Sequence, residues 1–255
     1  MQQNKGAFEV TIDLETLDVV GSKKSMPIIL SIGAVGFNPS VYQSPEEILT
    51  ADEAHELKDG RIQVCRTEGS VPLFYTPVSL AQSLRHGFTH SADTVKWWEK
   101  QRYNMLEIAA GHTERLIDTF ARFAAWLKVV KPTKVWANSP VFDVAILREA
   151  FDLMGMEFDV YFRDERDIRT AREFAEVRHE TKHSPDYYIQ HHALFDAAWE
   201  AWVVQAMYEQ KRLIAADRLE LTRLRAMEFE MTAAIAKSKD NEGAGVQDAC
   251  RTTKG

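Results

Sequence analysis

The chain has 255 residues, 45% apolar and 27% charged, and its 31 Lys and Arg against 38 Asp and Glu give a net charge of −7. The apolar content excludes a mostly disordered chain, and no apolar run reaches the ~20 residues that a membrane helix needs. Two cysteines, Cys65 and Cys250, are too few for a disulfide framework or a thiolate metal cage. Because the first residues also lack an apolar signal segment, we expect a cytoplasmic protein with no membrane partner. The net negative charge argues against a protein that binds nucleic acid through a large basic surface. It does not argue against an enzyme that binds phosphates through metal ions.

The first half of the chain predicts strands followed by helices. Alternating residues over 8–14 and a β-rich run over 28–37 predict two neighbouring strands, and 61–66 and 71–75 also have strand character. Residues 38–60 are interpreted as a loop or short insertion. A helix is expected to begin after Ser91, and 113–130 has apolar residues at helical intervals.

The second half predicts a short strand over 134–137 and helices over 141–154, 169–178 and 193–208, with Ser139 capping the first of them and Pro140 opening it. This order indicates an α/β domain over residues 1–210. Residues 211–239 contain no Gly or Pro and favour one long helix, which either docks on its own domain or forms a homodimer as a coiled coil. Residues 240–255 are interpreted as a flexible tail.

Four carboxylates lie where strands end or helices begin. Asp13 and Glu15 end the first strand on one face, and Asp143 and Asp196 fall in the first turns of two helices. Each has an ordinary explanation, either a polar strand edge or stabilisation of a helix dipole. Together, at the open edge of an α/β sheet, they would form an oxygen-ligand site for Mg²⁺ or Mn²⁺.

A histidine also accompanies the last of these carboxylates. His191 lies five residues before Asp196, and an imidazole beside a metal site can deprotonate water. His192 is adjacent to it. The chemistry of the residues does not decide which of the two histidines takes the proton from the water.

These residues form three motifs in order along the chain. Ile12-Asp-Leu-Glu-Thr16, followed by Ser31-Ile-Gly-Ala-Val35, then Asn138 to Asp143, then His191 to Asp196, resemble the exonuclease motifs of the DEDD superfamily in its histidine subtype. The segments 94–101 and 166–170 are closest to a subgroup of phage and bacterial enzymes similar to exonuclease A.

The resemblance implies a ribonuclease H-like fold, a mixed five-stranded sheet flanked by helices, with a long C-terminal helix added in this chain. It implies hydrolysis of terminal phosphodiester bonds at the 3′ ends of single-stranded DNA or RNA, releasing nucleoside 5′-monophosphates. Two Mg²⁺ or Mn²⁺ ions would be held by the four carboxylates. The family spacing selects His191 as the general base.

Eight further residues are candidates for substrate binding. Trp97 and Trp98 diverge by about 100° on a helix, so one belongs in the core and the other is free to stack on a base. Leu17 and Phe142 either shape a base pocket or simply pack. Arg166 and Arg169 lie in a run of alternating charge that is more typical of a solvated face, yet they are candidates for phosphate contact. The set is completed by two motif residues, Thr16 and Asn138.

Two other functions remain open from the sequence. One is oligoribonuclease-like clearance of very short RNA. The other is a catalytically idle nucleic-acid-binding or docking module, which would be expected to have lost some of the motif residues.

Overall fold

The computed structural model describes residues 8–18, 26–175 and 188–251. The chain divides into two compact units, Met1–Tyr208 and Glu209–Gly255. Among the described residues, no helix combines the length and apolarity of a membrane-spanning segment.

The first unit is built on a mixed sheet of six strands in the order β3-β4-β2-β1-β5-β6. β1 is antiparallel to β2, β2 to β4 and β4 to β3, whereas β5 is parallel to both β1 and β6. The strands are β1 Glu9–Thr16, β2 Ile29–Phe37, β3 Val64–Arg66, β4 Leu73–Pro77, β5 Val135–Ala137 and β6 Glu165–Asp167.

The expected fold class is confirmed, with one correction to the strand count. Five strands, β4-β2-β1-β5-β6, make the mixed sheet expected of a ribonuclease H-like fold. The sixth, β3, adds to the outer edge because Val64, Cys65 and Arg66 pair with β4. The observed sheet therefore has one strand more than the five expected.

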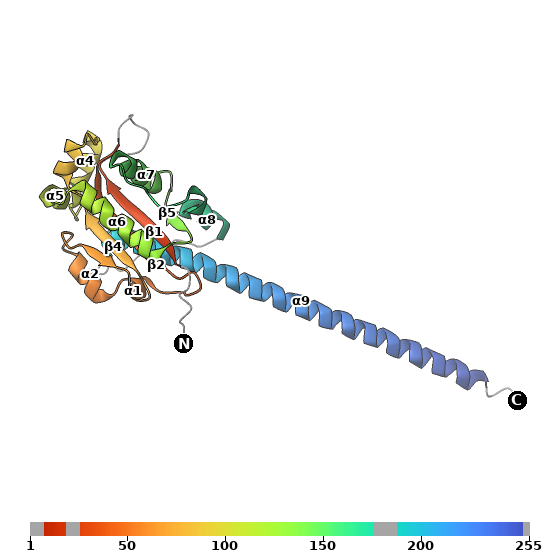
Figure 1. Cartoon of the computed structure of the whole chain (residues 1–255). Coiled ribbons are helices and arrows are strands. Elements are labelled where there is room, and N and C mark those ends of the chain that lie inside the picture. Colours follow the sequence, from red (N-terminus) through yellow and green to blue (C-terminus); the bar gives the residue numbers. More distant parts are fainter. Residues whose placement is uncertain (1–7, 19–25, 176–187, 252–255) are drawn as a thin grey trace. The chain divides into compact units, whose positions relative to one another are not determined.

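Helices cover the sheet (Figure 1). They are α1 Pro45–Ile48, α2 Ala51–Leu57, α3 Leu80–Arg85, α4 Ala92–Trp98, α5 Met105–Gly111, α6 Leu116–Val130, α7 Asp143–Leu153, α8 Ile168–Ala175 and α9 Ala193–Arg251, with a short 3₁₀ turn at Phe162–Asp164. α8 was expected to continue to residue 178, and residues 176–178 lie outside the described part of the chain.

Alternation along β1 sends its side chains to two different cores. Val10, Ile12 and Leu14 pack with residues of α6 and α7 on one face, and α6 crosses in front of the strands in Figure 1. The other face packs against the start of α9, where Leu194, Phe195 and Ala197 are buried together with Val35 and Tyr75. Thr11, Asp13 and Glu15 share this second face because successive strand residues point to opposite sides.

The segment 38–60 is not simply a loop, because it contains α1 and α2. Each helix begins with a capping box, Ser44 with Glu47 and Thr50 with Glu53, in which the side chain of each residue bonds to the backbone N–H of the other. This pattern satisfies amides that a helix N-terminus leaves unpaired. Four of the polar residues of this segment are thus helix caps.

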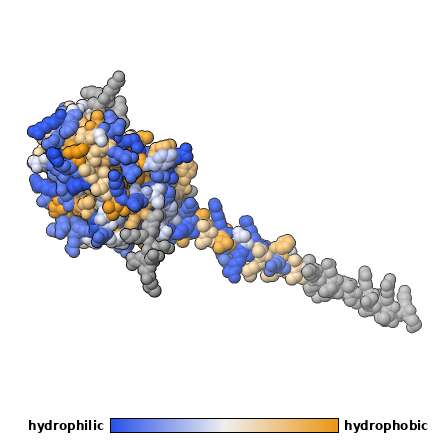
Figure 2. All heavy atoms as spheres, in the orientation of Figure 1, coloured by the Kyte–Doolittle hydropathy of each residue, from blue (hydrophilic) through white to orange (hydrophobic). Residues whose placement is uncertain are grey.

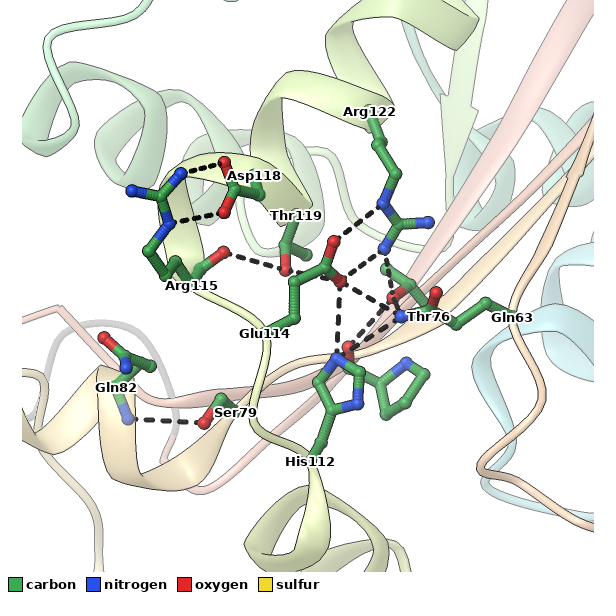
Figure 3. A network of polar contacts seen from close by, with 11 residues as sticks. Gln63, Thr76, Ser79, Gln82, His112, Glu114, Arg115, Asp118, Thr119 and Arg122 are labelled. Carbon is green, nitrogen blue, oxygen red and sulfur yellow. Dashed lines mark hydrogen bonds and ion pairs between the residues drawn. The ribbon is translucent and has the colours of Figure 1, made fainter.

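A polar network joins α6 to the sheet (Figure 3). Arg122 donates to both carboxylate oxygens of Glu114, at 3.0 and 2.6 Å, and to the Thr76 hydroxyl at 3.0 Å. Gln63 and Thr119 also donate to Glu114, at 3.0 and 3.2 Å. The paired Arg122 and these donors lower the pKa of Glu114 despite the opposing effect of burial.

The C-terminal helix differs from the expectation in both its start and its end. α9 runs without a break from Ala193 to Arg251, so the expected separate helices at 193–208 and 211–239 are one element, and most of the expected tail is helical. No proline interrupts 240–251, which lets the helix continue. Residues 252–255 lie outside the description.

The second unit exposes many apolar side chains, and Figure 2 shows them mixed with hydrophilic ones along its described part. The exposed large apolar residues are Leu213, Ile214, Leu219, Leu221, Leu224, Met227, Phe229, Met231 and Ile235. Asp217 and Glu228 interrupt the heptad seam that these residues would otherwise form.

Gly33 permits the close approach of β2 to the beginning of α9. A Cβ atom at this position would lie 2.2 Å from the carbonyl carbon of Ala193 and 2.4 Å from the backbone nitrogen of Leu194. Gly33 pairs with Asp13 across the β1–β2 ladder. The contact therefore sets the distance between the β1 carboxylates and the residues at the start of α9.

We expect Gly33→Ala to lower both stability and activity, because backbone must move to admit the methyl group. The loss in the free energy of unfolding should reach or exceed the ~1–3 kcal/mol typical of overpacking. Gly36→Ala, also on β2, is the matched control, since the nearest atoms to its methyl group would be side-chain atoms of Pro72, at 3.1 Å, and not backbone atoms at 2.2 Å. Urea denaturation of both variants measures the difference, and equal stabilities would contradict the role given to Gly33.

Candidate active site

Asp13 and Glu15 are carried by β1 on the face against which α9 begins. The Thr11 hydroxyl, on the same face, donates to the backbone carbonyl of Ala197 at 2.7 Å. This bond fixes the first turns of α9 beside the carboxyl end of β1. Residues 188–200 are thereby brought to the two strand carboxylates.

Glu15, His191 and Asp196 come together as a group. One potential ligand atom from each lies within 4.8 Å of the others, which is close enough to share a cation. The Tyr188 hydroxyl hydrogen-bonds to the Asp196 carboxylate. His191 has a positive φ of 62° and lies in a turn two residues before Ala193, the first residue of α9.

Asp143 joins the same group from α7. Its Oδ1 accepts a hydrogen bond from the backbone N–H of Leu14 at 3.2 Å, so it lies beside β1 at the residue between Asp13 and Glu15. The helix begins at Asp143 with Phe142 as its N-cap, two residues later than expected, and Ser139 makes no side-chain cap. The Ser139 carbonyl instead accepts from the backbone N–H groups of Phe142 and Asp143.

The charges of these carboxylates act strongly on one another. Burial, followed by the charges of Asp196 and Glu15, raises the pKa of Asp13 well above its usual value. Burial also raises the pKa of Asp143 and of Asp196 to about 7 each. The donor set consists of oxygen ligands held together against repulsion, which is the arrangement that a divalent cation stabilises.

His191 and His192 occupy different environments. His191 is half-buried and flanks the carboxylates, and burial lowers its pKa. His192 is fully buried and stacks on Tyr75 with ring centroids 4.2 Å apart, its Nδ1 accepts from the Leu194 N–H at 3.2 Å, and burial lowers its pKa to about 3. His192 is a neutral core residue, so geometry favours His191 as the residue that can act on a water.

The two tryptophans are also distinguished. Trp98 is buried in the core and its indole N–H donates to the Thr16 carbonyl at 3.0 Å. Trp97 is 41% exposed and meets the His191 ring edge-on, with centroids 4.7 Å apart. Of the pair, Trp97 is the residue beside the candidate site that a base could reach.

The remaining substrate-binding candidates differ in their burial and in their hydrogen bonds. Thr16 and Leu17 are buried, and the Thr16 hydroxyl donates to the Asp18 carbonyl at 2.8 Å. Phe142 packs partly against the core. Arg166 donates to the carbonyls of Arg163 and Glu165 at 2.6 and 2.7 Å, so its guanidinium is engaged locally.

Two other candidates have groups directed to the site region. Arg169 is exposed on α8, and its charge lowers the pKa of Asp143. The side-chain oxygen of Asn138 is buried and has no hydrogen-bond partner among the described residues. Asn138 directly follows β5, and Arg169 lies two residues after β6, the strand that pairs with β5.

Sequence reasoning missed two residues of the site. Tyr188, which bonds to Asp196, lies outside every motif and carried no signal. Glu200 is 2% exposed, and its charge raises the pKa of Asp13. A signal for Glu200 did exist, because it follows Asp196 by four residues and so shares its helix face.

We expect the metal-free protein to lose stability as pH rises from about 4 to 7. Unfolding lowers the raised carboxyl pKa values, including the pKa of about 7 of Asp143 and Asp196, so in this window these carboxyls bind more protons in the folded state than in the unfolded state. The lowered pKa values of His112, His191 and His192 act in the opposite direction. The carboxyls with raised pKa outnumber these histidines, and they are Asp13, Glu15, Asp143, Asp196 and Glu200. Thermal unfolding in chelator should therefore give a higher Tm at pH 5.5 than at pH 8, and added Mg²⁺ should raise Tm more at pH 8. A Tm in chelator that rises across this window would contradict the repulsion described here.

Buried carboxylates beside an imidazole, at the edge of a mixed α/β sheet, characterise the nucleases that cleave phosphodiester bonds with divalent cations. The family described as the 3′-5′ exoribonuclease Rv2179c-like domain matches residues 8–208, and the chain belongs to this family. It is a 3′–5′ exonuclease, which confirms the expected enzyme class. The narrower resemblance to the phage and bacterial subgroup stays a prediction.

Solved nuclease structures are similar to the chain at low sequence identity. The nuclease domain of 3′hExo, a DEDDh family member bound to rAMP, is 11% identical with a TM-score of 0.47, covering 81% of this chain and 94% of that one. S. pombe Pop2p in its Mg²⁺- and Mn²⁺-bound form is 12% identical with a TM-score of 0.42, covering 78% and 81%. Cell-death related nuclease 4 is 10% identical with a TM-score of 0.38, covering 82% and 64%. No curated protein sequence matches the chain.

Proposed function

We propose that this exonuclease removes nucleoside 5′-monophosphates from the 3′ ends of single-stranded RNA or DNA, with RNA as the substrate that the family description favours. The observation that carries the proposal is the convergence of Asp13, Glu15, Asp143 and Asp196 with His191 at one end of β1. The water oxygen would bond to phosphorus while the bond from phosphorus to the 3′ oxygen breaks. The shortened strand would leave with a free 3′ hydroxyl.

The four carboxylates would hold two divalent cations, Mg²⁺ or Mn²⁺. Such ions, when bound, activate a water and stabilise the leaving oxygen. Asp13 interacts electrostatically with all three of the other carboxylates, so it would hold the cations together with them. His191 would take the proton from the attacking water, which its place beside Glu15 and Asp196 supports.

The domain boundaries support a catalytic domain of residues 1–210. The family match ends at residue 208, and the first compact unit ends at Tyr208. We propose that the helix beyond it, expected at 211–239, serves docking or homodimerisation and takes no part in the chemistry.

The activity is tested with 5′-labelled RNA and DNA oligonucleotides of several lengths, in Mg²⁺, in Mn²⁺ and in chelator. We expect metal-dependent ladders that shorten from the 3′ end. Restriction of activity to oligonucleotides of a few residues would favour the oligoribonuclease-like alternative. Intact substrates under all conditions would favour an idle binding module and contradict the proposal.

Trp97→Ala is expected to raise KM for oligonucleotides with a much smaller effect on kcat. Stacking of a base on an aromatic ring contributes ~1–3 kcal/mol, which corresponds to a rise in KM of about 5- to 150-fold. Trp97→Phe keeps an aromatic face and is the matched control. Steady-state kinetics of both variants test the assignment, and an unchanged KM in Trp97→Ala would remove Trp97 from the binding surface.

A further inference from the structure

Glu200 is a fifth carboxylate of the buried acidic group. It follows Asp196 by one turn of α9, is 2% exposed, and interacts electrostatically with Asp13, Asp143 and Asp196. None of the three sequence motifs contains it. Its position on the helix places it on the same side as Asp196.

One oxygen of the Glu200 carboxylate has no hydrogen-bond partner in the described parts of the chain. This atom is Oε2, and it is buried. Arg169 and Arg172 of α8 act on it electrostatically, but neither forms an ion pair with it within the described residues, and Arg172 lies over the Trp199 ring at 5.6 Å. A buried carboxylate without a partner is costly unless a further group compensates its charge.

Glu9, another buried Glu of the first unit, shows how protein groups can satisfy such a residue. Glu9 accepts hydrogen bonds from Lys134 at 2.5 Å, from the Trp136 indole at 2.6 Å and from the Tyr208 hydroxyl at 2.9 Å. Glu200 has no comparable set, although it is equally buried. Groups in the described parts of the chain therefore leave this buried oxygen of Glu200 without a partner.

We propose that Glu200 belongs to the divalent-metal centre and binds a cation there, either directly or through a water bound to the cation. Oxygen donors are what Mg²⁺ and Mn²⁺ prefer, and an added cation would compensate a carboxylate oxygen that the described residues leave without a partner. The inference rests on the proposed function, because it requires that the neighbouring carboxylates hold cations. It assigns to Glu200 a role in metal affinity, distinct from the proton transfer assigned to His191.

The test is a calorimetric Mn²⁺ titration of the full-length protein, with Glu200→Gln and Glu9→Gln compared to wild type. Glu200→Gln should weaken Mn²⁺ binding by about 10- to 100-fold, the range seen when residues supporting a metal site are replaced. Glu9→Gln should bind Mn²⁺ like wild type, although it loses stability. In chelator, Glu200→Gln should unfold at a Tm no lower than that of wild type, because the substitution removes a buried charge.

Activity provides a second readout. Turnover by Glu200→Gln should need a higher Mn²⁺ concentration and recover at saturation. If Glu200→Gln fails to fold, Glu200→Asp takes its place, since it keeps the charge but withdraws the carboxylate by one methylene, and Mn²⁺ binding should weaken several-fold.

Wild-type Mn²⁺ affinity in the folded variant would overturn the inference while leaving the proposed function intact. Absence of Mn²⁺ binding by the wild-type protein itself would instead overturn the metal-dependent function. A lower Tm in chelator with unchanged Mn²⁺ affinity would assign Glu200 a purely structural role.

Discussion

Replacing Asp13 with asparagine is expected to lower kcat/KM for 3′-end hydrolysis by about 10³-fold or more. The substitution keeps the shape of the side chain but removes a charge that interacts with Glu15, Asp143, Asp196 and Glu200. Cation stabilisation of a transition state is worth several kcal/mol, and each ~1.4 kcal/mol is a tenfold change in rate. Initial rates on a labelled oligonucleotide at saturating Mg²⁺ measure the effect.

The control is Asp118→Asn, an exposed carboxylate that pairs with Arg115 and belongs to none of the site motifs. It should retain wild-type kcat/KM. Thermal unfolding in chelator separates loss of chemistry from loss of folding, because Asp13→Asn relieves repulsion and should not lower Tm. Wild-type turnover by Asp13→Asn would show that the reaction takes place elsewhere.

His191→Ala is expected to lower kcat by about 10²- to 10⁴-fold, the usual contribution of a positioned general base. Mn²⁺ binding should persist, because the carboxylates that hold the cations are unchanged. The prediction distinguishes proton transfer from metal ligation, since His191 also lies within ligand distance of Glu15 and Asp196. Single-turnover rates and Mn²⁺ titrations of the same preparation measure both properties.

His192→Phe is the companion variant for His191→Ala. It keeps a ring to stack on Tyr75 while removing both nitrogens, and should retain most of kcat when folded. Exogenous imidazole should partly restore His191→Ala and leave His192→Phe unchanged. The assignment of the base would have to move if His192→Phe lost as much turnover as His191→Ala.

Local patterns were sufficient to predict the carboxylate positions. The period of two along β1 puts Asp13 and Glu15 on one face, and the helix starts after short connections put Asp143 and Asp196 in first turns. The strands β1, β2, β4 and β5 were predicted within a few residues for the same reason. These features depend on spacing alone, so no tertiary information was needed.

Features that depend on contacts between distant segments were not predictable. Whether Trp97 or Trp98 enters the core is decided by the hydrogen bond of Trp98 to Thr16, 82 residues away in the chain. The burial of His192 depends on its stacking against Tyr75. The burial of Glu200 depends on the close approach of the start of α9 to Gly33. β6 was hidden in a run of alternating charge, because its three residues are only half-buried.

The most direct measurement of the central claim is product analysis after hydrolysis of an RNA oligonucleotide in ¹⁸O-labelled water with Mg²⁺. The account predicts nucleoside 5′-monophosphates released from the 3′ end with one ¹⁸O atom in each phosphate, and no such product with Asp13→Asn or in chelator. Nucleoside 3′-monophosphates or cyclic phosphates, formed equally well without metal, would contradict it.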